Sequence, residues 1–178
     1  MPRPRRVVVG VTGSIAAYKA AEVVRLLVKS GCEVRCVLTP NGAQFVTPLT
    51  LAALSRNPVA QNLHDPSLWK MAHLDLASWA DLVLVVPATV DFIARLAQGR
   101  AEGVLDALIL STKAKVAVCP ACDAEMWEHR ATQDNVKRIK DLGYEVWGPE
   151  KGELASGKTG WGRLREPEDV VRQALGKA

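Results

Sequence analysis

Two cysteines three positions apart, Cys119 and Cys122 in VCPACDAEMW, form a pattern found at metal sites and at thiol redox sites. A zinc site needs two more ligands, and the other two cysteines fit a buried strand, so we predict no metal site. A redox pair is the stronger alternative, because a strand followed by a helix start lowers a thiol pKa. The third interpretation is a substrate loop in which the thiols are incidental and the neighbouring residues act: Asp123, Met126 and Trp127.

The turn Thr12-Gly13-Ser14 lies between an apolar run and a helical pattern. Its small side chains leave backbone N–H groups open at a helix start, where the helix dipole attracts an anion. The stretch GVTGSIAA lacks the further glycines of a dinucleotide motif and the GK[ST] of a P-loop. On the local pattern alone, a phosphate site and a serine-capped turn fit equally well.

His73, in MAHLDLASWAD, is one of three histidines and lies just ahead of an apolar run. Such a histidine is usually a hydrogen-bonded surface residue, and a catalytic role needs a converging pocket. The residues alone leave both interpretations open.

Apolar runs of strand length alternate with helical patterns along the whole chain. The strand candidates are RVVVGVT (6–12), CEVRCVL (32–38), DLVLVV (81–86), AKVAV (114–118) and YEVWG (144–148). Continuous β-branched runs separated by helices predict an α/β fold whose parallel sheet is covered by helices on both faces. In the second run, the alternation places Cys32 and Cys36 beside Val34 on a buried face.

The composition fits one globular domain, with 178 residues of which 48% are hydrophobic and 24% charged. The net charge of +4 owes much to a basic N-terminal tip, residues 1–6, and only 5% of residues are aromatic, which disfavours a nucleic-acid partner. The apolar start is too short for a signal peptide or membrane span, and four cysteines are too few for a disulfide scaffold. We expect a soluble cytoplasmic protein without a membrane or nucleic-acid partner.

Ligands of open α/β sheets bind at the carboxyl ends of the strands. Four segments are expected to converge there: 12–19, 39–45, 87–92 and 120–127. The glycine-rich stretch 149–166 has little periodicity, and we expect it to be a mobile loop with a function.

Together these segments resemble the flavin-dependent cysteine decarboxylases, a family that includes phosphopantothenoylcysteine decarboxylases of coenzyme A synthesis and peptidyl-cysteine decarboxylases of lantibiotic maturation. The resemblance runs from about Val7 to Pro167. It rests on four stretches in family order: GVTGSIAAYK (10–19), HLDLASWADLVLVVPAT (73–89), PACDAEMW (120–127) and GELASGKTGWGRLREPED (152–169).

The resemblance implies a single Rossmann-like three-layer domain that binds FMN, usually as a homotrimer or a higher multiple with the cofactor at subunit contacts. By position, the FMN phosphate and ribityl chain would meet Gly13, Ser14 and Ile15. The rest of the flavin pocket would be formed by Thr39, Phe45, Pro87, Ala88, Thr89 and Asp91.

The same resemblance implies a catalytic role for His73 in the oxidative half-reaction. There the flavin oxidises the cysteinyl group of the substrate toward a thioaldehyde, whose C=S accepts the carbanion left when carbon dioxide departs. Ser156 stands where the loop often has a cysteine that returns a proton. A serine is a far weaker acid, so water or Lys158 would have to serve.

Two family amides are acids in this chain. The family motif PATAN reads PATVD, with Asp91, and the substrate motif Pro-x-Met-Asn has Asp123 in place of its asparagine. An ionised carboxylate would repel a substrate carboxylate that an amide would bind. Either the substrate lacks a carboxylate or carries a basic group, or one of the acids is held protonated.

The leading hypothesis is an FMN-dependent decarboxylase, with phosphopantothenoylcysteine favoured as substrate because of the GKTGWGRLREPED tail. A peptidyl-cysteine decarboxylase that makes an enethiol is the enzymatic alternative, consistent with Ser156. The third hypothesis is a non-catalytic flavin-binding regulatory subunit, in which Asp91 and Asp123 mark lost catalysis.

Overall fold

The structure, a computed structural model, describes residues 5–64 and 71–176. Its centre is a six-stranded sheet in the order β3-β2-β1-β4-β5-β6, in which every neighbouring pair is parallel. The strands are β1 (Arg6–Val11), β2 (Glu33–Leu38), β3 (Val59–Ala60), β4 (Leu82–Ala88), β5 (Lys115–Pro120) and β6 (Glu145–Val146). All five strands predicted from the sequence are present, and β3 is a short additional edge strand.

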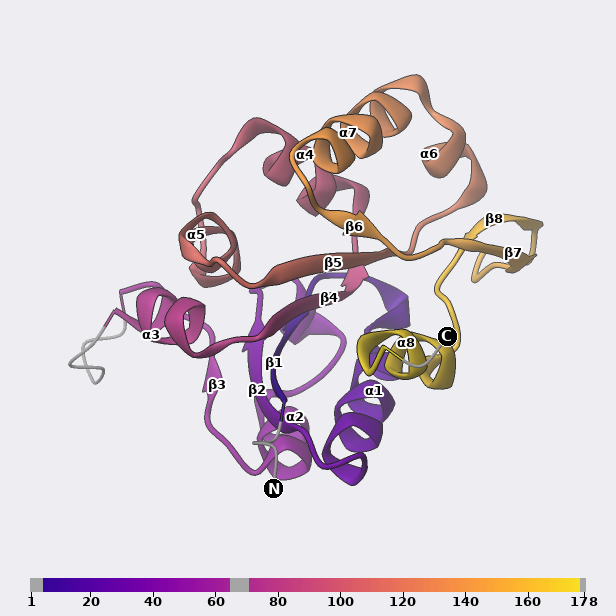
Figure 1. Ribbon diagram of the computed structural model, residues 1–178. Coiled ribbons are helices and arrows are strands. Elements are labelled where there is room, and N and C mark those ends of the chain that lie inside the picture. Colours follow the sequence, from indigo (N-terminus) through magenta and orange to yellow (C-terminus); the bar gives the residue numbers. More distant parts are fainter. Residues whose placement is uncertain (1–4, 65–70, 177–178) are drawn as a thin grey trace.

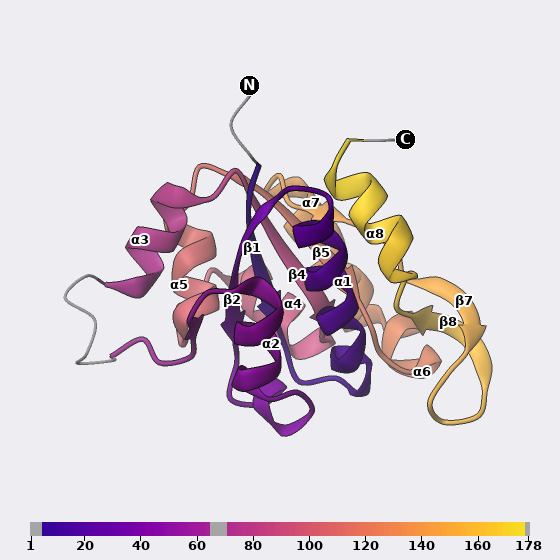
Figure 2. The same ribbon diagram turned by 90° about the horizontal axis from the view of Figure 1, so that it is seen from below.

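Helices cover both faces of this sheet (Figures 1 and 2). One core cluster includes residues of α1 (Tyr18–Lys29), α2 (Pro48–Ser55) and α8 (Pro167–Ala174). The other cluster includes residues of α3 (Ala72–Trp79), α4 (Val90–Gln98), α5 (Val104–Ser111) and α7 (Arg130–Asp141). The predicted Rossmann-like three-layer sandwich is confirmed.

Successive side chains along a strand alternate between the two core clusters. In β1, Val7 and Val9 pack into the first cluster and Val8 into the second. In β2, Cys36 lies in the first cluster together with Val34, and Cys32 just before the strand joins them. The prediction that these two thiols serve as small core side chains is therefore confirmed.

Glycines end two of the predicted helices. Gly31 (φ 84°) follows α1 and Gly143 (φ 90°) follows α7, both in the left-handed conformation that favours glycine at a helix end. The helix predicted from residue 14 differs at its start, because Ser14 caps a short 3-10 turn, η1 (Ile15–Ala17), before α1 begins.

The glycine-rich stretch is more ordered than the sequence suggested. It forms an antiparallel hairpin of β7 (Glu150–Glu153) and β8 (Thr159–Arg163), beside the short helix α6 (Ala124–Glu128) (Figure 1). Its alternation is hard to recognise because glycines fill positions where apolar side chains would otherwise stand. We call this element the hairpin.

At the N-terminus, the predicted basic tip is partly built into the fold. Arg6 begins β1 and forms an ion pair with Asp81 at 3.6 Å, whereas Arg3 lies outside the described residues. No helix in the described ranges has the length and apolar character needed to cross a membrane.

Candidate functional site

The strand order reverses between β1 and β4. From β1 the chain moves outward to β2 and β3, and from β4 it moves the other way to β5 and β6. Such a switch point leaves a crevice at the carboxyl ends of the two central strands. A cavity of about 650 Å³ lies there, edged by the turns that follow β1, β2 and β4. Its volume suits a cofactor-sized ligand.

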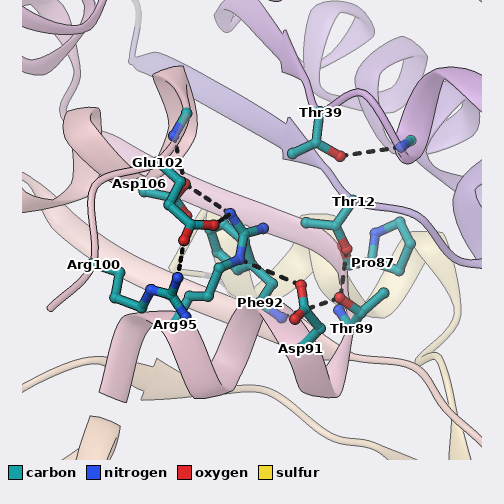
Figure 3. Close-up of polar contacts among 12 residues, drawn as sticks. Thr12, Thr39, Pro87, Thr89, Asp91, Phe92, Arg95, Arg100, Glu102 and Asp106 are labelled. Carbon is teal, nitrogen blue, oxygen red and sulfur yellow. Dashed lines mark hydrogen bonds and ion pairs between the residues drawn. The ribbon is translucent and has the colours of Figure 1, made fainter. Parts of the chain in front are cut away.

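Thr12 joins the two central strands at the edge of this first cavity. Its buried hydroxyl donates to the Pro87 carbonyl oxygen at 2.8 Å, and the Thr89 amide donates to the same hydroxyl at 3.0 Å (Figure 3). Thr89 then caps α4, with its side chain accepting from the Phe92 amide at 3.2 Å. These bonds fix the start of α4 against the turn after β1.

The turn after β2 is held closely against the turn after β1. The Thr39 hydroxyl donates to the Val11 carbonyl oxygen at 3.2 Å and accepts from the Gly42 amide at 3.1 Å. A Cβ at Gly13 would lie 2.5 Å from the Asn41 Cβ, so glycine is needed where the two turns meet. The cavity edge is therefore backbone and short side chains, which suits a phosphate and a sugar-like chain.

Charged side chains form one wall of the first cavity (Figure 3). The Arg95 guanidinium lies 2.9 Å from Asp106 Oδ2, 3.3 Å from Asp91 Oδ2 and 3.7 Å from Glu102 Oε2. We call these four residues the Arg95 cluster. Asp106 is buried, and that burial raises the pKa of its carboxyl while the Arg95 charge opposes the rise. Glu102 also pairs with Arg100.

A second cavity of about 500 Å³ lies between the start of α1 and the hairpin. Residues on opposite sides of it are Ser14 and Ile15 from the first turn, and Asp123 and Ser156. Because Gly13 lines the first cavity and Ser14 the second, the same turn edges both. The segment 120–127 thus meets the turn at Ser14, as the sequence predicted, and the hairpin also lines this cavity.

Asp123 is held as a carboxylate. A polar contact with the Glu125 side chain first, then the Ser156 hydroxyl, the Ala124 amide that donates at 2.7 Å and the charge of Lys158, lower the pKa of Asp123 to about 2. Lys158 pairs with Glu125, which raises the pKa of the lysine. For Asp123, the alternative of an acid held protonated is therefore disfavoured.

Glycines bring the hairpin against the Asp123 segment. The Cys122 amide donates to the Gly162 carbonyl oxygen at 3.0 Å, and a Cβ at Gly162 (φ 137°) would overlap the Cys122 carbonyl oxygen. At Gly160, a Cβ would lie 2.6 Å from the Ala124 Cβ. This backbone contact places the hairpin tip, with Ser156, over Asp123.

The Cys119 and Cys122 thiols are unsuited to redox chemistry. Cys119 is buried at the end of β5, and burial raises the pKa of its thiol to about 12. Burial first, and then the Asp123 charge, raises the pKa of Cys122 to about 11. A reactive pair needs a lowered thiol pKa, so the thioredoxin-like alternative is disfavoured.

The predicted site residues divide into three groups. The first cavity is lined by Gly13, Thr39, Thr89, Asp91 and Met126, and the second by Ser14, Ile15, Asp123 and Ser156. Lining neither cavity are His73, Phe45, Pro87, Ala88, Trp127 and Lys158. Pro87 and Ala88 are buried within β4, so their contribution is to place Thr89.

His73 lies apart from both cavities, on α3, which packs against α5. Its Nδ1 atom is buried without a hydrogen-bond partner in the structure. Phe45, on the turn after β2, is 47% exposed and faces outward. One chain alone therefore does not gather every residue that the sequence assigned to the site.

Sequence reasoning did not include Arg95, Asp106 and Asn41 among the site residues, although all three line the first cavity. Arg95 and Asp106 stand on different helices, eleven positions apart, and no local motif links them. The spacing of Asp91 and Arg95, four apart on a helix, was the one signal available.

A parallel sheet with a cavity at its switch point, edged by a small-residue turn, defines a nucleotide- or flavin-binding class of α/β protein. The Flavoprotein family model matches residues 1–178. The chain is 46% identical over 168 residues to the coenzyme A biosynthesis bifunctional protein CoaBC of Vibrio cholerae. That match covers 94% of this chain and 42% of the relative, so the chain spans about two fifths of the relative's length.

Solved structures agree with this placement. A cysteine-to-serine variant of PPC decarboxylase, complexed with pantothenoylaminoethenethiol, is similar with a TM-score of 0.86 and 25% identity, covering 97% of each chain. The FMN-dependent cysteine decarboxylase SpaF gives 0.85 and 28%, covering 98% of this chain and 97% of that one. The chain belongs to the Flavoprotein family.

Proposed function

We propose that this protein is an FMN-dependent carboxy-lyase that decarboxylates phosphopantothenoylcysteine to phosphopantetheine in coenzyme A synthesis. The observation that carries the proposal is the cavity of about 650 Å³ at the switch point, edged by Thr12, Gly13 and Thr39. The similarity to CoaBC and to PPC decarboxylase supports the substrate. Such a role would place the protein in the cytoplasm.

The residues present fit FMN. Gly13, Ser14 and Ile15 would hold its phosphate and ribityl chain at a turn where an added Cβ at Gly13 meets Asn41. Thr39, Thr89 and Asp91 would border the rest of the cofactor, with Pro87, Ala88 and Phe45 supporting that wall. When bound, FMN would supply the electron acceptor for oxidation of the substrate cysteinyl group.

The second cavity is where the substrate would bind. Asp123 and Ser156 face the turn at Ser14 from the far side, and Met126 reaches the first cavity. The Ser156 side chain helps to lower the pKa of Asp123, so its hydroxyl would lie beside a carboxylate. Lys158, beside Glu125, is the nearby cation that could deliver a proton through water.

The assignment of His73 as the catalytic histidine requires a second copy of the chain. His73 lines neither cavity of its own protomer, whereas exposed apolar side chains surround the cofactor turns, namely Ile15, Tyr18, Phe45 and Leu49. A homotrimer or higher multiple, in which one protomer supplies His73 to the cavity of another, accounts for both observations. In this proposal the 178 residues form one domain, with 149–166 as its mobile substrate element.

A peptidyl-cysteine decarboxylase that stops at an enethiol is the second candidate. Ser156 favours it, because a serine hydroxyl is a poor acid for the final protonation, and SpaF is a structural relative. A non-catalytic flavin-binding subunit is the third, supported by the two acids at positions 91 and 123.

The visible spectrum and the product test these alternatives together. The purified protein should show a flavin absorbance band, and with phosphopantothenoylcysteine it should release carbon dioxide and a saturated thiol. A persistent enethiol absorbance from a peptide with a C-terminal cysteine would support the second candidate. Bound flavin without turnover of either substrate would support the third.

A further inference from the structure

Asp91 places an acid at the first cavity, and the Arg95 cluster includes the cation that pairs with it. Asp91 lies in the first turn of α4, lines the first cavity, and keeps its side chain 72% exposed. A bare carboxylate there would repel the phosphate of an anionic cofactor, since like charges in one cavity oppose each other. Something in the chain must offset that charge if FMN binds.

Arg95 is placed to do so. It lies one helical turn after Asp91, with its Nε atom 3.3 Å from Asp91 Oδ2, and its own side chain is only 18% exposed. Its guanidinium carbon lies 5.2 Å from the centroid of the Phe92 ring, which limits the side chain on one side. A guanidinium has several N–H groups in a fixed plane, so it can hold two carboxylates at once.

Asp106 fixes the guanidinium in that position. Asp106 Oδ2 accepts from Arg95 Nη1 at 2.9 Å and from the Gly103 amide at 2.9 Å, and the Asp106 side chain is 2% exposed. The bond to Gly103 belongs to the start of α5, so the anchor is part of the backbone framework. Arg95 is thus oriented by a buried carboxylate and turned toward an exposed one.

We propose that Arg95 is a positioning residue of the cofactor cavity, which holds the Asp91 carboxylate in an ion pair and thereby lessens its repulsion of an anionic cofactor. This inference rests on the proposed FMN function. A cluster that merely tied α4 to α5 would affect stability without linking Asp91 to cofactor affinity.

The test measures the dissociation constant of FMN by quenching of flavin fluorescence on titration with apoprotein. Arg95→Gln is combined with Asp106→Asn so that no buried charge is left unpaired. This double variant leaves Asp91 uncompensated, and FMN binding weakens roughly tenfold. Adding Asp91→Asn to it restores the affinity to within about threefold of the native protein. In the native background, Asp91→Asn changes FMN affinity less than it does in the double variant, because Arg95 already offsets part of the Asp91 charge.

A second pair of variants, Arg95→Lys with and without Asp91→Asn, keeps the test informative if the double variant fails to fold. Arg95→Lys retains a cation but not the planar fork that spans two carboxylates, so FMN binding weakens by about threefold. Asp91→Asn recovers that loss. The matched control is the exposed pair Arg130 and Asp134 on α7, which has the same spacing, and Arg130→Gln with Asp134→Asn leaves FMN affinity unchanged.

The outcomes separate the two proposals. If native protein does not bind FMN, the proposed function is wrong and this inference falls with it. If native protein binds FMN but Asp91→Asn has the same effect in the native, Arg95→Lys and Arg95→Gln/Asp106→Asn backgrounds, the coupling is absent. The proposed function then stands, and the positioning role of Arg95 is overturned.

Discussion

Among single residues, Thr12 and Thr39 at the edge of the first cavity act by bonding to the backbone of the protein. The Thr12 hydroxyl bonds to the Pro87 carbonyl oxygen and the Thr89 amide, and the Thr39 hydroxyl bonds to the Val11 carbonyl oxygen and the Gly42 amide. Their work is to hold two turns at a fixed separation, since a ligand site depends on supporting bonds as much as on contact residues. In the proposed function, the side chains that would meet the substrate directly are Asp123 and Ser156, and His73 from a second copy.

His73→Asn should abolish turnover and leave the flavin bound. Asparagine cannot exchange a proton near neutral pH, and loss of acid–base catalysis typically costs about 100-fold or more in rate. The measurement is carbon dioxide release from phosphopantothenoylcysteine alongside the visible spectrum. His129→Asn is the control, because His129 is an exposed helix cap and asparagine caps equally well. Normal turnover by His73→Asn would remove this histidine from the mechanism.

Asp123→Asn should lower KM for a carboxylate substrate by roughly tenfold, because an amide replaces a repelling anion. The fold is preserved, since asparagine also caps the start of α6. The pKa of Asp123 is lowered to about 2, so the difference in KM should persist from about pH 5 to pH 8. Kinetics at several pH values check this, and a difference that vanishes toward pH 5 would contradict an ionised Asp123.

The lowered pKa of Asp123 also makes the free energy of unfolding depend on pH. Ionised Asp123 favours the folded state above its unfolded pKa near 3.9, and that contribution is lost as the pH falls toward 2. Asp123→Asn should therefore reduce the acid sensitivity of unfolding, with the effect confined to that pH window. Because Asp123 is exposed, solvent screening keeps this effect small.

At the scale of elements, the hairpin links the segment around Asp123 to the start of α1 at the second cavity. It docks through the Cys122 amide and the Gly162 carbonyl, while Lys19 of α1 pairs with Glu166 at 3.1 Å just beyond β8. These contacts hold the base of the hairpin and leave its tip, with Ser156, at the second cavity.

Gly162→Ala should displace the hairpin base. The added Cβ would overlap the Cys122 carbonyl oxygen, and φ of 137° is unfavourable for alanine, so we expect a loss of about 2 kcal/mol in unfolding free energy. Urea unfolding measures the loss, and hydrogen exchange at the Cys122 amide reports the broken bond. Gly157→Ala is the control, because Gly157 has φ 81° but no atom within 4 Å, and it should cost less. Equal losses would show that backbone strain alone matters.

The sequence predicted the elements whose side chains are mostly buried and missed those whose side chains are mostly exposed. The apolar runs 81–86 and 114–118 predict buried strands, and β4 and β5 form there. The hairpin strands, EKGE and TGWGR, bury little, so periodicity gave no signal. The Arg95 cluster was missed for a related reason: its members look like ordinary helix charges until α4 and α5 are packed together.

For the whole molecule, the central question is whether one chain makes a complete site. The turns after β1 and β2 lie side by side at Gly13 and Asn41, and they carry exposed Ile15 and Phe45. Solvent-exposed apolar side chains grouped around a cofactor turn are typical of a surface that another protomer covers. We propose that His73 on α3 is the complementary half, since it lines neither the first nor the second cavity.

Mixing two inactive variants tests this sharing. Gly13→Val blocks the cofactor turn, because a side chain there meets Asn41, and His73→Asn removes the catalytic imidazole. In randomly mixed oligomers, about a quarter of shared sites pair an intact turn with an intact histidine from a neighbour, so about a quarter of native activity should return.

The control mixes Gly13→Val with Gly42→Val, whose added side chain would meet the Val11 carbonyl oxygen on the same side of the site. Every protomer in that mixture has one of its two cavity turns blocked, and no activity should return. Light scattering of the native protein should show a trimer or a multiple of three. Inactivity of the first mixture in oligomers of that size would mean that each chain uses its own His73, and α3 would then have to move toward the first cavity.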